Sequence, residues 1–377
     1  MKRLAVVHYL PLEFYPPAVN LLNAFAEKDL FNTKVWTTHN NKQRQVFKSP
    51  TVTSISRTIA PKKKDNKGFR LLKYLLFNFK TFMGLLFFNP EVILYYESYS
   101  AGPVYWYLKY FGNNKRLFIH CHEYFDAQWY AKGMSLAKLY HTYEKNYLYP
   151  KAAWISHTNT QRVALFLEDH PNVSKNKVQT IKNYPPKSWA TTRETSTIKP
   201  QVNIAPIKLV YVGSLGINNT FIQEFCNWVQ SKKGMVTFTI YAFNTTKPTY
   251  NYLSSLHSDY IDFKPGGIEY DKIPQVLSIY DIGVILYKGN TLNAKFCVSN
   301  KLFEYLACGL EVWVTKEQEG TLPYLDSNNQ PRVMALDFEN FDQTLIKSHK
   351  AARILPYKTH LFNFENQLDS IVAAMLN

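Results

Sequence analysis

The chain has 377 residues, of which 46% are hydrophobic and 19% are charged. This composition excludes an intrinsically disordered protein, and a total of only 14 glycines excludes collagen-like and glycine-linker proteins. The formal net charge is +16, and nearly all of it lies in residues 1–185, where 26 Lys and Arg stand against 11 Asp and Glu. The asymmetry predicts that the N-terminal half faces something anionic, with a generally basic surface as the alternative interpretation.

Strands and helices alternate through the first half of the chain. The apolar runs predict strands at 4–8, 34–38, 92–96, 117–121, 153–156 and 178–181. Helical spacing predicts helices at 18–27, 69–88 and 135–149, the last ending before Pro150, and another beginning at Thr158 or Asn159. This alternation predicts a parallel sheet with helices on both faces.

A basic loop followed by an apolar helix stands out within this half. Lys62, Lys63 and Lys64 precede the predicted helix 69–88, in which Arg70, Lys73 and Lys80 fall on one narrow face. One interpretation is a helix lying in a membrane interface near anionic headgroups, and the other is a helix packed into an α/β core. The lysine cluster favours membrane contact slightly, whereas nucleic acid is disfavoured because no known binding motif accompanies the charge. No stretch of 18 uncharged apolar residues occurs, so a membrane-spanning helix is not expected.

A second alternating unit follows a linker predicted at Tyr184–Pro186 and 191–200. Its predicted strands are 208–213, 236–241, 260–263, 282–286 and 311–315, and its predicted helices are 221–231, 272–280, 300–307 and a closing helix at 363–375. We therefore predict an N-terminal domain at 1–185, a C-terminal domain at 186–358, and a final helix within 359–377 that returns to the N-terminal domain. Four widely spaced cysteines (Cys121, Cys226, Cys297 and Cys308) indicate free thiols in a reducing compartment.

The segment 281–315 reads as strand, loop, helix, glycine stop and strand. Ser299 is a plausible N-cap, and Leu302, Phe303 and Leu306 are expected to face inward. The free N–H groups and positive dipole end of the helix that follows Ser299 suit a phosphate, and Lys301 in the first turn adds charge. Glu304 lies near enough to accept hydrogen bonds from ribose hydroxyls.

Residues 299–309, Ser-Asn-Lys-Leu-Phe-Glu-Tyr-Leu-Ala-Cys-Gly, resemble the nucleotide-sugar helix of the GT-B glycosyltransferases, in particular the retaining, family 4-like enzymes. Ile261–Tyr287 resembles the strand–loop–helix–strand run before that helix, Gly213–Gly216 the glycine turn that opens the C-terminal domain, and His122-Glu123 a catalytic loop. The resemblance implies two Rossmann-like domains facing each other across a cleft. It also implies sugar transfer from a UDP- or GDP-sugar to a glycan or polyprenyl-linked acceptor of surface polysaccharide synthesis. The location implied is cytoplasmic, at the inner membrane face, and peripheral on an anionic membrane.

The resemblance also implies roles for particular residues. Donor binding falls to Gly213, Ser214, Ile268, Lys295, Cys297, Val298, Ser299, Asn300, Lys301 and Glu304. Catalysis falls to His122 and Glu123, and acceptor binding to Glu13 and Tyr15. Membrane binding by Lys62, Lys63, Lys64, Arg70 and Lys73 is predicted from the charge pattern and not from the resemblance. The sequence departs from the family at Phe296, where a glutamate is common, at Ser214 and Asn218 or Asn219, where a basic pair is common, and at Glu311, where a proline is usual.

Three alternatives stay open at this point. An inverting transferase would need a side-chain base, for which Glu123, Asp126 and Glu13 are candidates. The missing glutamate and basic pair favour a non-catalytic protein that binds sugar nucleotides or glycans. The same fold could also carry a nucleotide-sugar epimerase. No Asp-x-Asp motif is present, so neither a metal clamp on the diphosphate nor any other cofactor is expected.

Overall fold

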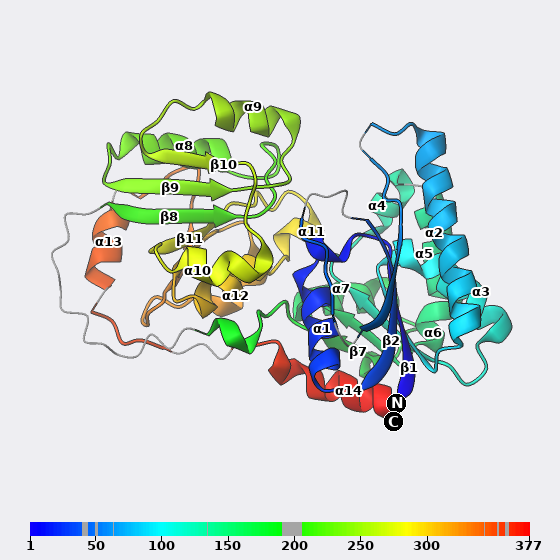
Figure 1. The fold of residues 1–377 in the computed structure, drawn as a ribbon. Coiled ribbons are helices and arrows are strands. Elements are labelled where there is room, and N and C mark those ends of the chain that lie inside the picture. The colour runs from blue at the N-terminus through cyan, green and yellow to red at the C-terminus, as the bar shows by residue number, and fades with distance from the viewer. Residues whose placement is uncertain are drawn as a thin grey trace. The chain divides into compact units, whose positions relative to one another are not determined.

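The structure is a computed structural model that describes residues 1–39, 44–49, 52–62, 64–133, 135–190, 206–342, 344–352, 354–358 and 362–377 (Figure 1). It divides into two compact units, unit 1 with residues 1–182 and 364–377 and unit 2 with residues 183–363. Most of the predicted linker, 191–200, and the predicted membrane residue Lys63 lie outside the described residues.

Unit 1 is built on a seven-stranded sheet with all neighbouring strands parallel, in the order β3-β2-β1-β4-β5-β6-β7. The strands are β1 (Lys2–His8), β2 (Phe31–Thr38), β3 (Val52–Thr58), β4 (Val92–Tyr96), β5 (Arg116–Cys121), β6 (Trp154–His157) and β7 (Val178–Thr180). Every residue of β4 is buried, as expected for a central parallel strand covered on both faces.

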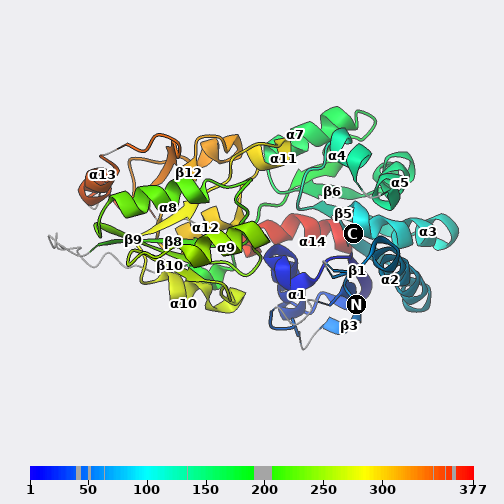
Figure 2. The same cartoon turned by 90° about the horizontal axis from the view of Figure 1, so that it is seen from above.

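Helices cover both faces of this sheet, with α1 on one face and α2 and α3 side by side on the other (Figures 1 and 2). The helices are α1 (Pro16–Glu27), α2 (Lys67–Phe88), α3 (Ala101–Phe111), α4 (Ala127–Lys132), α5 (Ser135–Tyr143), α6 (Tyr149–Lys151), α7 (Thr160–Asp169) and α14 (Leu368–Leu376). The closing helix α14 belongs to unit 1, where Gln367 just before it exchanges hydrogen bonds of 2.7 and 2.9 Å with the backbone of Lys182.

Unit 2 has a six-stranded parallel sheet in the order β10-β9-β8-β11-β12-β13. Its strands are β8 (Ile207–Val212), β9 (Val236–Tyr241), β10 (Ile261–Lys264), β11 (Ile282–Ile285), β12 (Glu311–Thr315) and β13 (Val333–Leu336). Its helices are α8 (Ile222–Ser231), α9 (Lys247–Ser255), α10 (Ile273–Leu277), α11 (Leu292–Lys295), α12 (Asn300–Ala307) and α13 (Leu345–Ala352). The alternation that predicted two parallel α/β units is confirmed.

Several local predictions are wrong for identifiable reasons. The helix predicted to end before Pro150 instead passes through a π-helical turn, Glu144–Leu148, and continues as α6, because a proline is tolerated in the first turn of a new helical segment. Strand β3 was missed because only two of its seven residues, Val52 and Ile55, are apolar. The predicted helix 272–280 is shortened to α10, and the predicted helix 363–375 is a 3₁₀ turn at Glu365–Gln367 followed by α14.

The three basic residues predicted to share one face of helix α2 are separated in the structure, because Arg70 and Lys80 are exposed and Lys73 is not. Lys73 is buried, with its ammonium 2.6 Å from the Asp65 carboxylate, so it does not belong to an exposed basic face. The outward side of α2 is apolar, and only a third of its most apolar window is buried. The opposite side packs in the core of unit 1 through Tyr74, Phe77, Leu85 and Phe88, so α2 is a core helix on one side and an exposed apolar helix on the other. Among the described residues, α2 is also the one helix long and apolar enough to cross a membrane. It was not expected from the sequence because the criterion used there required a stretch without any charged residue.

Candidate functional site

Helix α12 of unit 2 begins as the sequence predicted. The Ser299 hydroxyl caps the helix by accepting a hydrogen bond from the Lys301 N–H at 3.4 Å, and Leu302, Phe303 and Leu306 are buried in the core. Behind the helix, the Tyr305 hydroxyl accepts a hydrogen bond of 3.0 Å from the Val212 N–H at the end of β8. The first turn of α12 is therefore fixed beside the carboxyl end of β8.

Lys301 is the central charge of this end of unit 2. It is only 8% exposed, and its ammonium donates a hydrogen bond of 2.9 Å to the Tyr287 hydroxyl. The ammonium also lies 5.3 and 5.1 Å from the centres of the Tyr211 and Tyr287 rings. Burial alone would lower the pKa of Lys301, but interactions with Tyr211, Tyr287 and Glu304 outweigh it and raise that pKa. Lys301 is therefore a cation at neutral pH.

Gly213 lies against the end of this lysine. Its φ is +141°, and a Cβ added there would lie 2.6 Å from Lys301 Cε and 2.9 Å from Nζ. A side chain at this position would displace the ammonium, so the glycine is needed for the close approach. Glu304 is buried one turn further along α12, within electrostatic range of Lys301. The structure thus brings together Gly213, Lys301 and Glu304, three of the predicted donor-binding residues.

The other predicted donor-binding residues differ in their burial and in their partners. Ser299 is buried, Asn300 is partly buried at the start of α12, and Ser214 is exposed after β8. Ile268 and Val298 belong to the hydrophobic core of unit 2, so their side chains are not available to a polar ligand. Cys297 accepts a hydrogen bond of 3.4 Å at its carbonyl from Gln318, and the half-exposed Lys295 pairs with Glu319 at 2.8 Å. A role for Lys295 therefore competes with an existing ion pair.

In unit 1, the two predicted catalytic residues follow β5. His122 is 6% exposed, its ring stacks on Tyr96 at 5.1 Å, and it lies 5.2 Å from the ring of Tyr15. Burial, with smaller contributions from the neighbouring histidines and Arg162, holds the pKa of His122 well below its usual value. The imidazole is therefore neutral, and its Nε2 has no hydrogen-bond partner among the described residues.

Glu97, directly after β4, is a site residue that the sequence analysis missed. It accepts hydrogen bonds from the N–H groups of His122 (2.6 Å) and Glu123 (3.1 Å), and it is 5% exposed. Burial and the nearby Glu123 raise the pKa of Glu97 to about 8. Its backbone has φ +60° and ψ 155°, a conformation that is sparsely populated for any residue except glycine. One feature of the sequence could have indicated Glu97: it is an acidic residue at the end of a wholly apolar strand.

Arg162 of α7 was also missed. It is 1% exposed and donates hydrogen bonds to the His122 carbonyl and to Thr158 Oγ1, the latter at 2.9 Å. Its second terminal nitrogen lies 3.2 Å from the carboxylate of Glu123, which is 44% exposed. Glu97 and Arg162 therefore hold the His122–Glu123 loop from two sides.

The predicted acceptor residues have different outcomes. The Glu13 side chain is 3% exposed and pairs with Arg57 at 2.7 Å, while accepting a hydrogen bond of 2.8 Å from the Phe47 N–H. Oε1 of that carboxylate fastens a loop inside unit 1, whereas Oε2 has no hydrogen-bond partner among the described residues, so the role of Glu13 at an acceptor or as a base stays a prediction. Asp126 caps α4 through a 2.7 Å hydrogen bond from the Trp129 N–H. Tyr15 remains beside His122.

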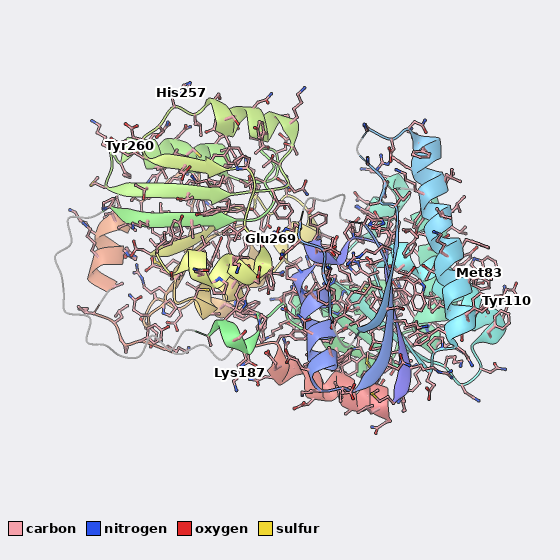
Figure 3. All side chains as sticks on the ribbon, viewed as in Figure 1. Met83, Tyr110, Lys187, His257, Tyr260 and Glu269 are labelled. Atoms are coloured by element: carbon pink, nitrogen blue, oxygen red, sulfur yellow. The ribbon has the colours of Figure 1, made fainter. Side chains whose placement is uncertain are left out.

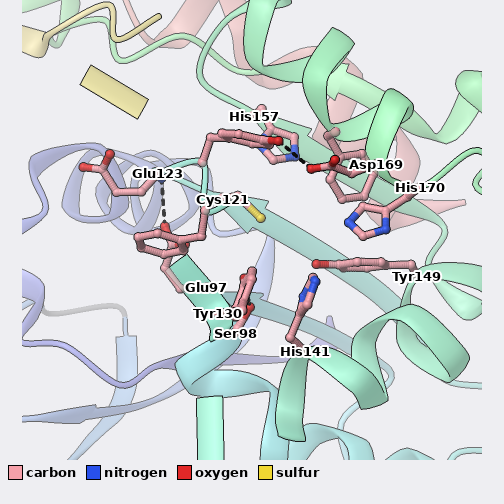
Figure 4. A pocket seen from close by; sticks show the side chains of 13 residues that line it. Glu97, Ser98, Cys121, Glu123, Tyr130, His141, Tyr149, His157, Asp169 and His170 are labelled. Carbon is pink, nitrogen blue, oxygen red and sulfur yellow. Dashed lines mark hydrogen bonds between the residues drawn. The ribbon is translucent and has the colours of Figure 1, made fainter. Parts of the chain in front are cut away.

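A small pocket of unit 1 opens next to Glu97 and Glu123 (Figure 4). It is lined by five aromatic rings, three imidazoles and three carboxyl groups, together with Ser98 and Cys121: Tyr124, Phe125, Tyr130, Tyr149, Phe166, His141, His157, His170, Glu97, Glu123 and Asp169. Beneath it, the buried Glu144 accepts hydrogen bonds from the hydroxyls of Tyr95 (2.9 Å) and Ser98 (2.5 Å). Aromatic faces beside a few fixed polar groups suit a small hydroxylated ligand.

Comparison with solved structures identifies the fold. The chain aligns over its full length with the N-terminal domain of a Candida albicans trehalose-6-phosphate phosphatase (97% of that chain, TM-score 0.68, 11% identity). It aligns likewise with Anabaena HepE in complex with UDP and glucose (96%, TM-score 0.61, 11% identity). Neisseria meningitidis UDP-GlcNAc 2-epimerase bound to UDP-GlcNAc is a third such structure (100%, TM-score 0.57, 14% identity). No family model and no curated protein was found to match the sequence.

The chain therefore has the GT-B fold, with the two parallel-sheet α/β domains of that architecture. The similar structures include both a protein bound to UDP and glucose and an epimerase, so the fold alone does not choose the reaction.

Proposed function

We propose that this protein is a glycosyltransferase that moves a sugar from a UDP- or GDP-sugar to a glycan or polyprenyl-linked acceptor in surface polysaccharide synthesis. The observation that carries the proposal is the buried ammonium of Lys301 in the first turn of α12. In the part of the chain that the structure describes, no carboxylate forms an ion pair with it. A buried cation at a helix N-terminus whose direct hydrogen bond goes to a tyrosine hydroxyl is suited to bind the diphosphate of a nucleotide sugar.

The donor would be held by residues around this charge. Lys301 and the N–H groups at the start of α12 would bind the diphosphate, and Gly213 would let it approach the backbone of the β8 turn. Glu304 would accept hydrogen bonds from the ribose hydroxyls. Backbone groups near Ile268 would meet the nucleobase, since the Ile268 side chain is part of the core. These groups supply the positive charge that a leaving diphosphate needs, so we propose a reaction that requires no metal ion.

The catalytic groups of unit 1 would act on the transferred sugar. The neutral His122, with Nε2 lacking a partner among the described residues, would donate or accept one hydrogen bond at a sugar hydroxyl or at the leaving oxygen. One such electrostatic contact contributes about 3 kcal/mol to transition-state stabilisation. We propose retention of configuration, with the departing phosphate taking the proton of the acceptor hydroxyl on the same face. The acceptor would bind near Tyr15 and the pocket beside Glu123.

Binding of nucleoside diphosphates to Lys301→Met tests the donor site directly. We expect UDP or GDP to bind the wild-type chain in calorimetry and to bind Lys301→Met at least tenfold more weakly, because methionine keeps the length and removes the charge. Lys295→Met is the matched control, since Lys295 already pairs with Glu319. Equal affinity in wild type and Lys301→Met, with both folded, would overturn the proposal.

Turnover separates catalysis from binding. A transferase releases nucleoside diphosphate from its donor in the presence of a polyprenyl-linked acceptor, and His122→Ala should reduce that release while leaving nucleotide affinity unchanged. A non-catalytic nucleotide-sugar protein is the second candidate, favoured by Phe296, where the sequence departs from the glutamate expected from the family resemblance. It would bind the nucleotide through Lys301 and never consume a donor.

A further inference from the structure

The outward face of α2 is an uninterrupted apolar stripe. It consists of Leu72, Leu75, Leu76, Phe79, Met83 and Phe87, which recur at helical spacing. The side chains of Leu72, Phe79 and Phe87 are 59%, 63% and 84% exposed, although all three are large and apolar. From Leu72 to Phe87 the stripe is about 22 Å long, at about 1.5 Å per residue. A continuous exposed apolar surface of this length indicates an interaction site.

Helix α3 extends the same surface sideways. The Phe111 ring of α3 contacts the Phe82 ring of α2 at 6.4 Å, and Trp106 stacks on Tyr110 at 6.0 Å. Tyr110 and Phe111 are 62% and 52% exposed. Figure 3 shows Met83 on α2 and Tyr110 on α3 on the same outer side of the two helices. We call the stripe together with Trp106, Tyr110 and Phe111 the α2–α3 face.

The charges around the α2–α3 face are all of one sign. Neither α2 nor α3 contains an aspartate or a glutamate. Exposed basic side chains stand at the start of α2, along its edge, on α3 and in the preceding loop: Lys62, Lys64, Lys67, Arg70, Lys80 and Lys109. The carboxylate that lies nearest to the start of α2, Asp65, is neutralised by the buried Lys73 at 2.6 Å. An apolar surface with a purely basic fringe is complementary to a layer of anionic headgroups above hydrocarbon.

We propose that the α2–α3 face docks unit 1 onto an anionic lipid bilayer, lying in the interface without crossing it. Crossing is disfavoured because Tyr74, Phe77, Leu85 and Phe88 on the inner side of α2 are buried in the core of unit 1. A second copy of the chain is a poorer occupant, since a symmetric dimer would bring two basic fringes together. Trp106 and Tyr110 have the amphipathic rings that favour the headgroup level.

The docking places lipid headgroups at the functional edge of the sheet. All strands of the unit 1 sheet are parallel, and α2 begins after β3, so the basic loop lies at the same carboxyl edge as Glu97 and His122 (Figure 1). A lipid-linked acceptor would reach this edge from the bilayer surface. The docking itself does not depend on the proposed transfer, and it is measured without any nucleotide sugar.

Vesicle flotation of the full chain tests the proposal. We expect wild type to float with vesicles of equal parts phosphatidylglycerol and phosphatidylcholine, and to bind pure phosphatidylcholine at least tenfold more weakly. Phe79→Glu should weaken binding to the anionic vesicles about tenfold or more. The substitution removes a ring that would be buried in the bilayer, and it adds a negative charge that the anionic headgroups repel. Ile279→Glu is the matched control, since Ile279 of unit 2 is 60% exposed and should bind like wild type.

A second variant and a second measurement keep the outcome decisive. Replacing Lys62, Lys64, Arg70 and Lys80 by glutamine should weaken binding to anionic vesicles by at least tenfold, and added salt should weaken wild type in the same direction. Circular dichroism melting checks that the variants are folded, as expected for substitutions of exposed side chains. Absence of wild-type binding, or equal binding by Phe79→Glu, overturns the proposal, as does sedimentation showing a stable dimer that Phe79→Glu dissociates.

Discussion

Glu97→Gln tests whether the carboxyl group behind the His122 loop is protonated in the folded chain. The Glu97 carboxyl accepts hydrogen bonds from the N–H groups of His122 and Glu123 through one oxygen, Oε1. A glutamine amide oxygen can accept the same two bonds, so the substitution removes the titration and keeps the geometry. The variant therefore isolates the electrostatic contribution of this one group.

The magnitude follows from the displaced pKa. Burial and the neighbouring Glu123 raise the pKa of Glu97 from 4.5 to about 8. Between these values the folded chain binds one proton more than the unfolded chain, so the free energy of unfolding falls as pH rises. The stability from this group is complete below pH 4.5 and lost by about pH 8. At 1.36 kcal/mol per pH unit, the loss across the window is on the order of 5 kcal/mol.

Urea unfolding at several pH values between 4.5 and 8 measures this difference. We expect Glu97→Gln and wild type to have similar free energies of unfolding at the acid end, and the variant to become progressively more stable toward pH 8. Other titrating groups contribute equally to both chains and cancel in the difference. Glu168→Gln, at an exposed glutamate of α7, provides a control with no such trend. A difference between Glu97→Gln and wild type that stays constant with pH would refute the reasoning.

Three further outcomes are expected. Gly213→Ala should weaken nucleoside diphosphate binding at least tenfold in calorimetry, because the added Cβ would lie 2.6 Å from Lys301 Cε at a backbone φ of +141°. Arg332→Met should lower the free energy of unfolding in urea by about 3–5 kcal/mol, because it leaves the buried Glu311 without its main ion pair at 2.9 Å. Melting temperature should fall as pH drops from 6.5 toward 4, because burial lowers the pKa of His8 to about 4 and of His120 to about 3, so these imidazoles protonate more readily in the unfolded chain.

The sequence was sufficient for the architecture because the strands of both sheets are short apolar runs. Val92–Tyr96 and Ile282–Ile285 are buried throughout, so their patterns carry no ambiguity about which face is inside. The start of α12 was predictable for a local reason as well, since the Ser299 cap and the Gly309 stop act within a few residues of the chain. Local rules therefore located the start and the end of α12.

The sequence was insufficient where a residue's role depends on distant partners. Glu97 is defined by backbone groups of His122 and Glu123, 25 and 26 residues away, and by a strained backbone angle that no composition rule signals. Tyr287 reaches Lys301 only because β11 and α12 meet in the folded unit. The two interpretations of α2 stayed open for a related reason: its apolar residues surround most of the helix, so periodicity could not decide which side faces the sheet.

Lys73 and Lys301 are both buried lysines, and they differ in whether a carboxylate lies beside the ammonium. Lys73 and Lys301 are 7% and 8% exposed, so burial does not distinguish them. Lys73 has the Asp65 carboxylate at 2.6 Å, which neutralises it and anchors the loop before α2. Lys301 has the Tyr287 hydroxyl at 2.9 Å, which satisfies one hydrogen bond, and no carboxylate at ion-pair distance among the described residues. A buried charge is costly to the fold unless it is compensated, and within the described part of the chain Lys301 has only the more distant Glu304 as a counter-charge, so this difference between the two lysines is what the proposed diphosphate site rests on.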